Sequence, residues 1–284
     1  MEKSVDRLKV VENIEKNIKA GKFNDKVEEG DPILTDEERE TLIVNCDNLK
    51  KKWKNKFMAV VARNVADRIT ITENELTEII GIENVQDIDT GAIITCNHFS
   101  KYDNTVIRYL MQKIGKKKKL YIVVQETNMK MDGGIGWLMK NCYTIPISQS
   151  VDYIQNNFVP TLEKIFENKG YVLIYPEQEM WFNYKKPRPL KIGAYHYACK
   201  FNVPIIPCFI EIVNTSEIGE DGFKKINYRL HILPPIYPDN EKPLKERKEE
   251  MRDKDYNERV KLYEKLYNRK VNSKFDKKKD IAGW

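Results

Sequence analysis

The chain has 284 residues, of which 41% are apolar and 32% are charged, a composition typical of folded globular proteins rather than disordered ones. Its 49 Lys and Arg residues against 43 Asp and Glu residues give a net charge of +6, which suits an anionic membrane surface, a phosphorylated substrate or nucleic acid. No stretch approaches the roughly 18 uninterrupted apolar residues of a membrane-spanning helix, so we expect any membrane contact to be peripheral.

The start of the chain and its cysteines both indicate an intracellular protein. The segment MEKSVDRLKVVENIEK is charged every few residues and lacks the apolar core and small-residue cleavage site of a signal peptide, so no export is expected. The cysteines form neither a CxxC pair nor the spacing of a small disulfide scaffold. They are Cys46, Cys96, Cys142, Cys199 and Cys208. We therefore expect reduced thiols and a cytoplasmic location.

Residues 1–85 are polar and helical in character. The piece WKNKFMAVVARNVADRI has apolar residues at the spacing of one helical stripe, which are Trp53, Phe57, Val60, Val61, Val65 and Ile69. Such a helix either packs on the rest of the domain or lies in the headgroup layer of a membrane. Both interpretations stay open from the sequence.

From Gly91 onward, short apolar runs alternate with helical stretches. The runs are GAIITC, KLYIVVQ, YTIPI, YVLIYP, VPIIPCFIEIV and INYRLHIL. The alternation predicts an α/β fold, with a central mainly parallel or mixed sheet flanked by helices and preceded by an N-terminal helical extension. The tail from Leu244 to about Lys274 is rich in Lys, Glu and Arg, and predicts a helix whose charges form solvated pairs.

The stretch TCNHFSKYDNT, residues 95–105, joins a predicted buried strand to a predicted helix. Asn97 and His98 fall at the carboxyl end of that strand, where open α/β sheets usually place their sites. Ser100 and Asp103 match a Ser-x-x-Asp capping box, in which the acid accepts a hydrogen bond from the backbone of the capping residue. This is the ordinary structural interpretation of Asp103.

The functional interpretation makes Asp103 the partner of His98. The carboxylate would fix the tautomer of the imidazole and stabilise the imidazolium that forms when His98 takes a proton. A pair of this kind suffices for acyl transfer from a thioester when the acceptor brings its own hydroxyl. Cys96, on the same face of the strand, is either a rival nucleophile or a buried structural residue. His196 and His231 lie far from any zinc-ligand spacing, so no metal is expected.

Three further blocks follow in the chain: GWLMKNCYTIPI, YPEQEMW and VPIIPCFI. Together with Asn97-His98-x4-Asp103 and Ser100, they resemble the glycerolphosphate and lysophospholipid acyltransferase superfamily over roughly residues 91–212. The resemblance implies an acyltransferase α/β domain with a C-terminal helix over residues 86–284, and a helical extension over residues 1–85 that packs on the core or on a membrane surface. It also implies that His98 is the general base and Asp103 its partner.

The phosphate-binding positions depart from the family pattern. The third block usually reads Phe-Pro-Glu-Gly-Thr-Arg, and this chain keeps Glu177 but has Gln178 in place of the glycine and Met180 in place of the arginine. The second block has Gln149 where an arginine is common. Neither Gln nor Met forms the paired charge-assisted hydrogen bonds through which arginine binds a phosphate.

The segment FNYKKPRPLKIGAY supplies cations soon after Glu177. We expect Lys185, Lys186 and Arg188 to bind an anionic head group, with a solvated basic loop as the alternative. Three aromatic residues beside them either stack on a sugar or pack in the core: Trp181, Phe182 and Tyr184.

We therefore expect an acyltransferase that moves a fatty acyl group from acyl carrier protein or coenzyme A to a hydroxyl of a lysophospholipid or glycerolipid-type acceptor. Asn97, Ser100 and Glu177 are expected to shape the substrate site, and no cofactor is expected beyond the acyl thioester. The alternatives are an acyltransferase acting on a glycolipid or cell-envelope sugar, and a non-catalytic lipid-binding relative. We expect a peripheral location at the inner face of the membrane, and no nucleic-acid binding because no aromatic-studded basic motif is present.

Overall fold

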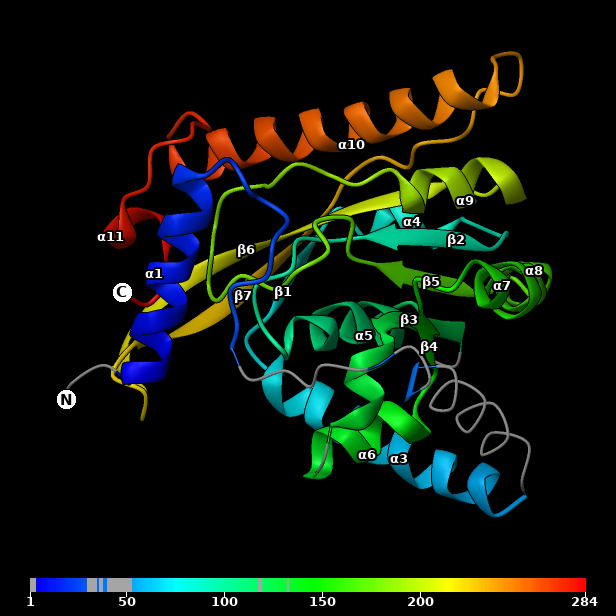
Figure 1. The fold of residues 1–284 in the computed structure, drawn as a ribbon, viewed down its shortest axis with the longest axis horizontal. Helices are drawn as coiled ribbons and strands as arrows, with labels where there is room; N and C mark the ends of the chain where they lie inside the picture. Colours follow the sequence, from blue (N-terminus) through cyan, green and yellow to red (C-terminus); the bar gives the residue numbers. More distant parts are fainter. Residues whose placement is uncertain (1–3, 30–34, 36–37, 40–52, 117–118, 132) are drawn as a thin grey trace.

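A seven-stranded sheet forms the centre of the computed structural model, which describes residues 4–29, 35, 38–39, 53–116, 119–131 and 133–284 (Figure 1). The strands are β1 (Glu78–Ile80), β2 (Ala92–Thr95), β3 (Leu120–Gln125), β4 (Thr144–Ile147), β5 (Tyr171–Ile174), β6 (Ile205–Ile218) and β7 (Lys224–Ile232). Their order is β1-β7-β6-β2-β5-β3-β4. Only β6 and β7 pair antiparallel, and the other neighbours are parallel. The predicted α/β fold with a mixed sheet is confirmed.

Helices cover both faces of this sheet. They are α1 (Val5–Lys19), α3 (Trp53–Glu73), α4 (Glu83–Gln86), α5 (Asp103–Lys113), α6 (Gly133–Asn141), α7 (Val151–Tyr153), α8 (Val159–Glu167), α9 (Gly193–Phe201), α10 (Leu244–Tyr267) and α11 (Lys277–Asp280), with single turns η2 (Glu126–Lys130) and η3 (Ile154–Phe158). In Figure 1, α9 and α10 lie on one side of the sheet, and α3, α5 and α6 lie on the other. Among the described helices, none is both long and apolar enough to cross a bilayer.

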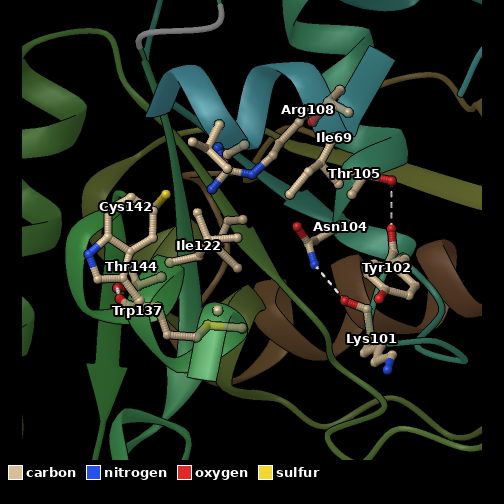
Figure 2. Close-up of a pocket in the computed structure, with 16 residues that line it drawn as sticks. Ile69, Lys101, Tyr102, Asn104, Thr105, Arg108, Ile122, Trp137, Cys142 and Thr144 are labelled. Atoms are coloured by element: carbon tan, nitrogen blue, oxygen red, sulfur yellow. Dashed lines mark hydrogen bonds between the residues drawn. The ribbon is translucent and has the colours of Figure 1, made fainter. Parts of the chain in front are cut away.

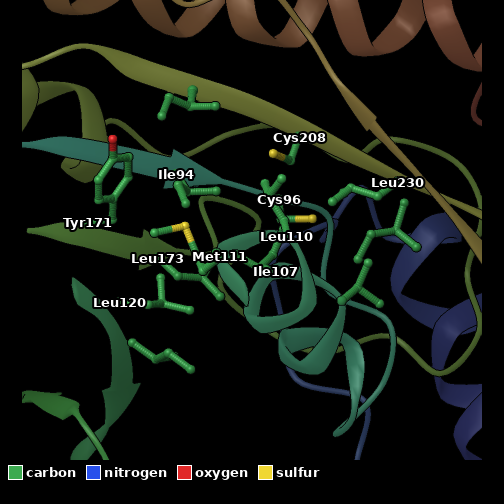
Figure 3. Close-up of a cluster of buried hydrophobic side chains, with 14 of the residues drawn as sticks. Ile94, Cys96, Ile107, Leu110, Met111, Leu120, Tyr171, Leu173, Cys208 and Leu230 are labelled. Atoms are coloured by element: carbon green, nitrogen blue, oxygen red, sulfur yellow. The ribbon is translucent and has the colours of Figure 1, made fainter. Parts of the chain in front are cut away.

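The central strand β2 supplies both halves of the core. Ile94, together with Cys96 just after the strand, contributes to a buried cluster shared with α5, which Figure 3 shows, while Ile93 belongs to a second buried cluster that includes residues of α8, α9 and α10. All four residues of β2 are buried because β5 and β6 cover its two edges and the two clusters cover its two faces. A strand buried on both faces reads as a continuous apolar run, as GAIITC does.

The N-terminal residues do not form one separate extension with a boundary at residue 85. β1 already belongs to the sheet, since Ile79 pairs with Leu230 of β7. α1 packs at the far end of the sheet in a cluster with Trp181, Phe223 and Ile281, whereas α3 packs against α5 and α6. The predicted boundary at residue 85 therefore lies after β1, which belongs to the sheet. The sequence did not reveal β1 because a strand of three residues is too short to show a periodic pattern.

α10 confirms the predicted C-terminal helix, but the prediction that its charges are solvated is wrong for two of them. Asp255 and Arg259 are fully buried and form an ion pair one helical turn apart. Asp255 also accepts hydrogen bonds from the Thr95 hydroxyl at 2.6 Å and the Tyr195 hydroxyl at 2.7 Å. The pair thus joins α10 to β2 and α9. In the sequence these residues are indistinguishable from the exposed charges around them.

We expect Arg259→Met to destabilise the fold by roughly 3–5 kcal/mol, because it leaves the buried Asp255 carboxylate without its cation. The free energy of unfolding, measured by urea titration, checks this. Arg252→Met is the matched control, since Arg252 lies on the same helix, is 33% exposed and pairs with its neighbour Asp253. It should change stability by less than about 1 kcal/mol. Equal effects of the two substitutions would rule out a special role for the buried pair.

Candidate active site

His98 and Asp103 meet at the carboxyl end of β2. The chain leaves β2 at Thr95 and enters α5 at Asp103, and this turn returns the carboxylate to the histidine. Nδ1 of His98 lies 2.8 Å from Oδ2 of Asp103. The Asp103 side chain is fully buried, whereas the His98 side chain is 22% exposed. A molecule from solvent can therefore contact His98, whereas the buried Asp103 carboxylate affects such a molecule only through its contact with His98.

The Asp103 carboxylate is held by four donors. Besides the His98 ring, Oδ2 accepts the backbone N–H groups of Phe99 at 2.9 Å and Ser100 at 3.1 Å, and Oδ1 accepts the hydroxyl of Tyr175 at 2.7 Å. The bond from the Ser100 N–H is the one expected of the capping acid, but α5 begins at Asp103 with Tyr102 as its N-cap, so the predicted capping box with Ser100 as N-cap is only half formed. Asp103 thus holds the turn before α5 and also contacts His98. Because a carboxylate accepts the proton on Nδ1, the lone pair of the neutral ring lies on Nε2.

Tyr175 completes this arrangement and was not predicted from the sequence. Its ring stacks on the His98 ring, with centroids 4.0 Å apart and an angle of 18° between the planes. Burial, followed by the charge of Asp103, raises the pKa of Tyr175 well above its ordinary value, so the hydroxyl stays protonated and donates. The order of the strands could have identified Tyr175. Because β2 and β5 are parallel neighbours, the residues that follow Thr95 and Ile174 lie side by side at the carboxyl edge of the sheet.

Glu177 and Arg188 form a buried ion pair behind the backbone of His98. Nη2 of Arg188 lies 2.9 Å from Oε2 of Glu177, and the two side chains are 1% and 2% exposed. The same guanidinium donates to the carbonyl oxygens of His98 at 3.2 Å and Phe23 at 3.1 Å. Glu177 in turn accepts the backbone N–H of His98 at 3.4 Å. Both charges are thus used to position the main chain.

Asn97 and Ser100 also contact the protein itself. The Asn97 amide donates to the carbonyl of Ile210 at 3.1 Å and accepts its N–H at 2.8 Å, which extends the pairing of β2 with β6 beyond the strand end. The Ser100 hydroxyl accepts the N–H of Tyr102 at 3.2 Å. The structure therefore places both residues where they fix the backbone on either side of His98.

The basic loop after Glu177 lies against the C-terminal segment. Lys186 is buried, pairs with Asp280 at 2.8 Å and donates to the carbonyl of Lys274. Lys185 lies with Nζ 5.5 Å from the centre of the Tyr267 ring, and burial lowers its pKa.

The placement of the loop corrects the expectation that all three of its cations bind a head group. Lys186 and Arg188 are committed to internal carboxylates, because a buried charge requires a partner of its own. The neighbouring aromatic residues are buried as well and pack with α1: Trp181, Phe182 and Tyr184.

Cys96 has the properties of a core residue. It is completely buried in the cluster of Figure 3, and its thiol lies 3.5 Å from Oδ1 of Asn97. Burial raises the pKa of the Cys96 thiol well above its ordinary value, which opposes formation of a nucleophilic thiolate. His231 contacts Glu211 at 3.0 Å. Cys46 lies outside the described residues.

An apolar cavity of about 310 Å³ opens beside α5, and residues of α3, α6, β3 and β4 complete its wall (Figure 2). Asn104 and Thr105, which directly follow Asp103, line it together with Ile69, Ile122 and Trp137. In Figure 2, Lys101 and Tyr102 lie at one end of the cavity and Trp137 and Cys142 at the other. The candidate site thus combines a partly exposed histidine with an adjacent apolar space.

Comparison with known proteins agrees with this geometry. Residues 77–211 match the sequence model of the family described as acyltransferase. The fold is similar to the crystal structure of the 1-acyl-sn-glycerophosphate (LPA) acyltransferase PlsC from Thermotoga maritima, at 18% sequence identity and a TM-score of 0.52. That similarity covers 82% of this chain and 90% of the other, and at this identity it shows a shared fold. No curated protein matches the chain significantly.

Proposed function

We propose that the chain, which matches the acyltransferase family model over residues 77–211, moves a fatty acyl group from an acyl thioester to a hydroxyl of a lysophospholipid or glycerolipid acceptor. The observation that carries the proposal is the 2.8 Å contact between His98 and the buried Asp103, which leaves Nε2 of a partly exposed ring available to accept a proton. The donor is the thioester of acyl carrier protein or coenzyme A.

His98 acts as general base in the proposed reaction. The acceptor hydroxyl gives its proton to Nε2 as its oxygen attacks the thioester carbonyl, forming a C–O bond. Collapse of the tetrahedral intermediate breaks the C–S bond, and the departing thiolate takes the proton from Nε2. Asp103 stabilises the transient imidazolium, and Tyr175 holds both the carboxylate and the ring in place. General base catalysis of this kind typically contributes 10²–10⁴-fold to a rate.

The cavity beside α5 favours a lipid substrate. Its wall is mainly apolar and includes Asn104 and Thr105, which directly follow Asp103 on α5, so the cavity offers space for a hydrocarbon chain on the helix that carries the carboxylate. The sugar-acceptor alternative loses one of the two features that favoured it, because Trp181 and its aromatic neighbours are buried rather than available for stacking, while the missing family arginines still favour it.

We further propose that α3 rests on the membrane surface. Phe57 is 64% exposed and Ile71 is 56% exposed, and both lie on the outward stripe of the helix with Val60. Ala62 and Ala66 form the inward face. α3 also lines the cavity through Ile69, so a lipid bound at this helix is adjacent to the site. The surplus of positive charge favours an anionic bilayer.

Replacing His98 with Gln is expected to lower acyl transfer by roughly 10²–10⁴-fold, because Gln cannot accept the hydroxyl proton. The assay follows acyl release from acyl carrier protein and coenzyme A thioesters with a panel of lysolipid acceptors. His196→Gln is the control, since this partly exposed histidine lies on α9 and should leave the rate within about twofold. An active His98→Gln variant would refute the base assignment, and an inactive natural protein would refute the activity.

Replacing Tyr175 with Phe is expected to lower kcat by about tenfold, because the stack on His98 remains while the hydrogen bond to Asp103 is lost. Without that donor, the Asp103 carboxylate attracts the proton on His98 more strongly, so the acidic limb of the pH profile of kcat/KM moves to higher pH. Tyr197→Phe on α9 serves as control. A pH profile identical to that of the natural protein would show that Tyr175 has only a packing role.

Replacing Phe57 with Asp is expected to reduce binding to anionic phospholipid vesicles by at least about tenfold, since burial of a large apolar side chain contributes about 1.5–3 kcal/mol. Co-sedimentation with vesicles measures the bound fraction. Leu244→Asp is the control, because this exposed residue begins α10 on the opposite side of the sheet. Unchanged binding of the Phe57 variant would contradict docking through α3.

A further inference from the structure

The loop between β5 and α9, residues 175–192, holds His98 in place but contains no helix or strand of its own. Tyr175 stacks on the His98 ring. The ion pair of Glu177 and Arg188 holds the main chain of the same residue. A loop of this length keeps one shape only when other segments hold it, because its backbone otherwise retains conformational entropy. The position of His98 therefore depends on what holds the loop.

Residues 23–25, which follow α1, form an N-terminal clasp on both arms of this loop. The side-chain amide of Asn24 donates to the carbonyl oxygens of Glu177 at 3.1 Å and Pro189 at 2.8 Å. Glu177 lies in the arm that leaves β5, and Pro189 directly follows Arg188 in the arm that enters α9. A single amide group therefore closes the loop at the point where the buried ion pair also joins its two arms.

The other two residues of the clasp contact the loop through their carbonyl groups. Phe23 accepts a hydrogen bond from Nη1 of Arg188 at 3.1 Å. Asp25 accepts one from the indole N–H of Trp181 at 2.9 Å. The backbone N–H of Trp181 in turn donates to the carbonyl of His98 at 3.1 Å, and the guanidinium of Arg188 donates to the same carbonyl. Each of these two contacts thus links the clasp to the main chain of His98 through one residue.

Asn24 is suited to hold the loop without taking part in the chemistry. It is partly exposed, whereas the side chains of Glu177 and Arg188 are 2% and 1% exposed. Attraction within a buried ion pair is strong, and water that enters when the loop opens weakens it and lets salt screen it. We propose that Asn24 is a positioning residue: it keeps the loop closed on the ion pair, and the pair keeps the main chain of His98 in place for proton transfer. This inference rests on the proposed function, in which His98 is the general base.

The test compares the natural protein with Asn24→Ala, which removes both side-chain hydrogen bonds to the loop. The acceptor is a short-chain lysolipid that dissolves as single molecules, so that binding to membranes does not affect the rate. We expect kcat to fall by about 3–10-fold, the effect of about one lost hydrogen bond, with KM changed less than about twofold. The ratio of the variant's kcat to the natural kcat should fall further in roughly 0.5 M salt, because the loosened ion pair is open to screening.

Asn13→Ala is the matched control. Asn13 lies on α1 and is also partly exposed. Its amide donates two hydrogen bonds, to the carbonyl of Val27 and the carboxylate of Glu29. Neither partner belongs to the loop, so kcat should stay within about twofold of the natural value at both salt concentrations. Equal losses of kcat in the two variants would show a general loosening of the N-terminal residues and overturn the proposal. A natural kcat in Asn24→Ala, or a kcat ratio that salt does not change, would overturn it as well.

Hydrogen exchange keeps the proposal testable if the natural protein transfers no acyl group, an outcome that would refute the proposed function alone. The probe is the backbone N–H of Trp181, which donates to the carbonyl of His98. Asn24→Ala should speed the exchange of this N–H by about 3–10-fold, because the loop opens more often, and the control variant should not. Unchanged exchange in Asn24→Ala would refute the positioning role.

Discussion

The buried ion pair between Glu177 and Arg188 fixes the backbone on which the candidate site depends. It joins the loop that follows β5 to the main chain of His98, and through Phe23 it also holds the segment after α1. Removing two charges from water costs several kcal/mol, which their attraction repays only when the remaining donors and acceptors are also used. The guanidinium meets that condition by donating to backbone carbonyls as well as to Glu177. The pair is therefore a structural element that holds His98 in place, and its charges are not available to a substrate.

The site above this pair depends on two neighbouring parallel strands that end at one edge of the sheet. β2 delivers His98 and β5 delivers Tyr175, and the helix that begins at Asp103 returns a carboxylate to both. Since this carboxylate has a donor for each of its oxygens, it cannot rotate without breaking hydrogen bonds. The histidine ring is held on one edge by Asp103 and on one face by Tyr175. The Nε2 atom of the ring is therefore left to accept a proton from a substrate. A general base must be held in a fixed position with such an atom available.

The sequence was sufficient for features set by local pattern and insufficient for those set by distant partners. The sheet class and the helix that carries the apolar stripe from Trp53 to Ile69 follow from periodicity, and the bond from the Ser100 N–H to Asp103 follows from a local motif, both of which operate over a few residues. Lys186 pairs with Asp280, 94 positions away, and no local pattern reveals this. Arg259 is likewise an ordinary helix charge in the sequence, although it is fully buried and pairs with Asp255. Whether such a charge is buried and paired or faces solvent is decided by tertiary packing.

Gln178 shows how the ion pair and the loop geometry are connected. Its φ of 69° lies in the left-handed region, which costs a residue with a side chain about 1–2 kcal/mol, and the resembling family has glycine at this place. The conformation persists because its surroundings determine it: the N–H of Gln178 donates to the carbonyl of Tyr175 at 3.0 Å, and the preceding Glu177 is anchored by Arg188. The turn therefore ties the catalytic edge of β5 to the buried pair within three residues. A strained residue retained at this point is consistent with a loop whose shape is fixed by the site it supports rather than by its own sequence.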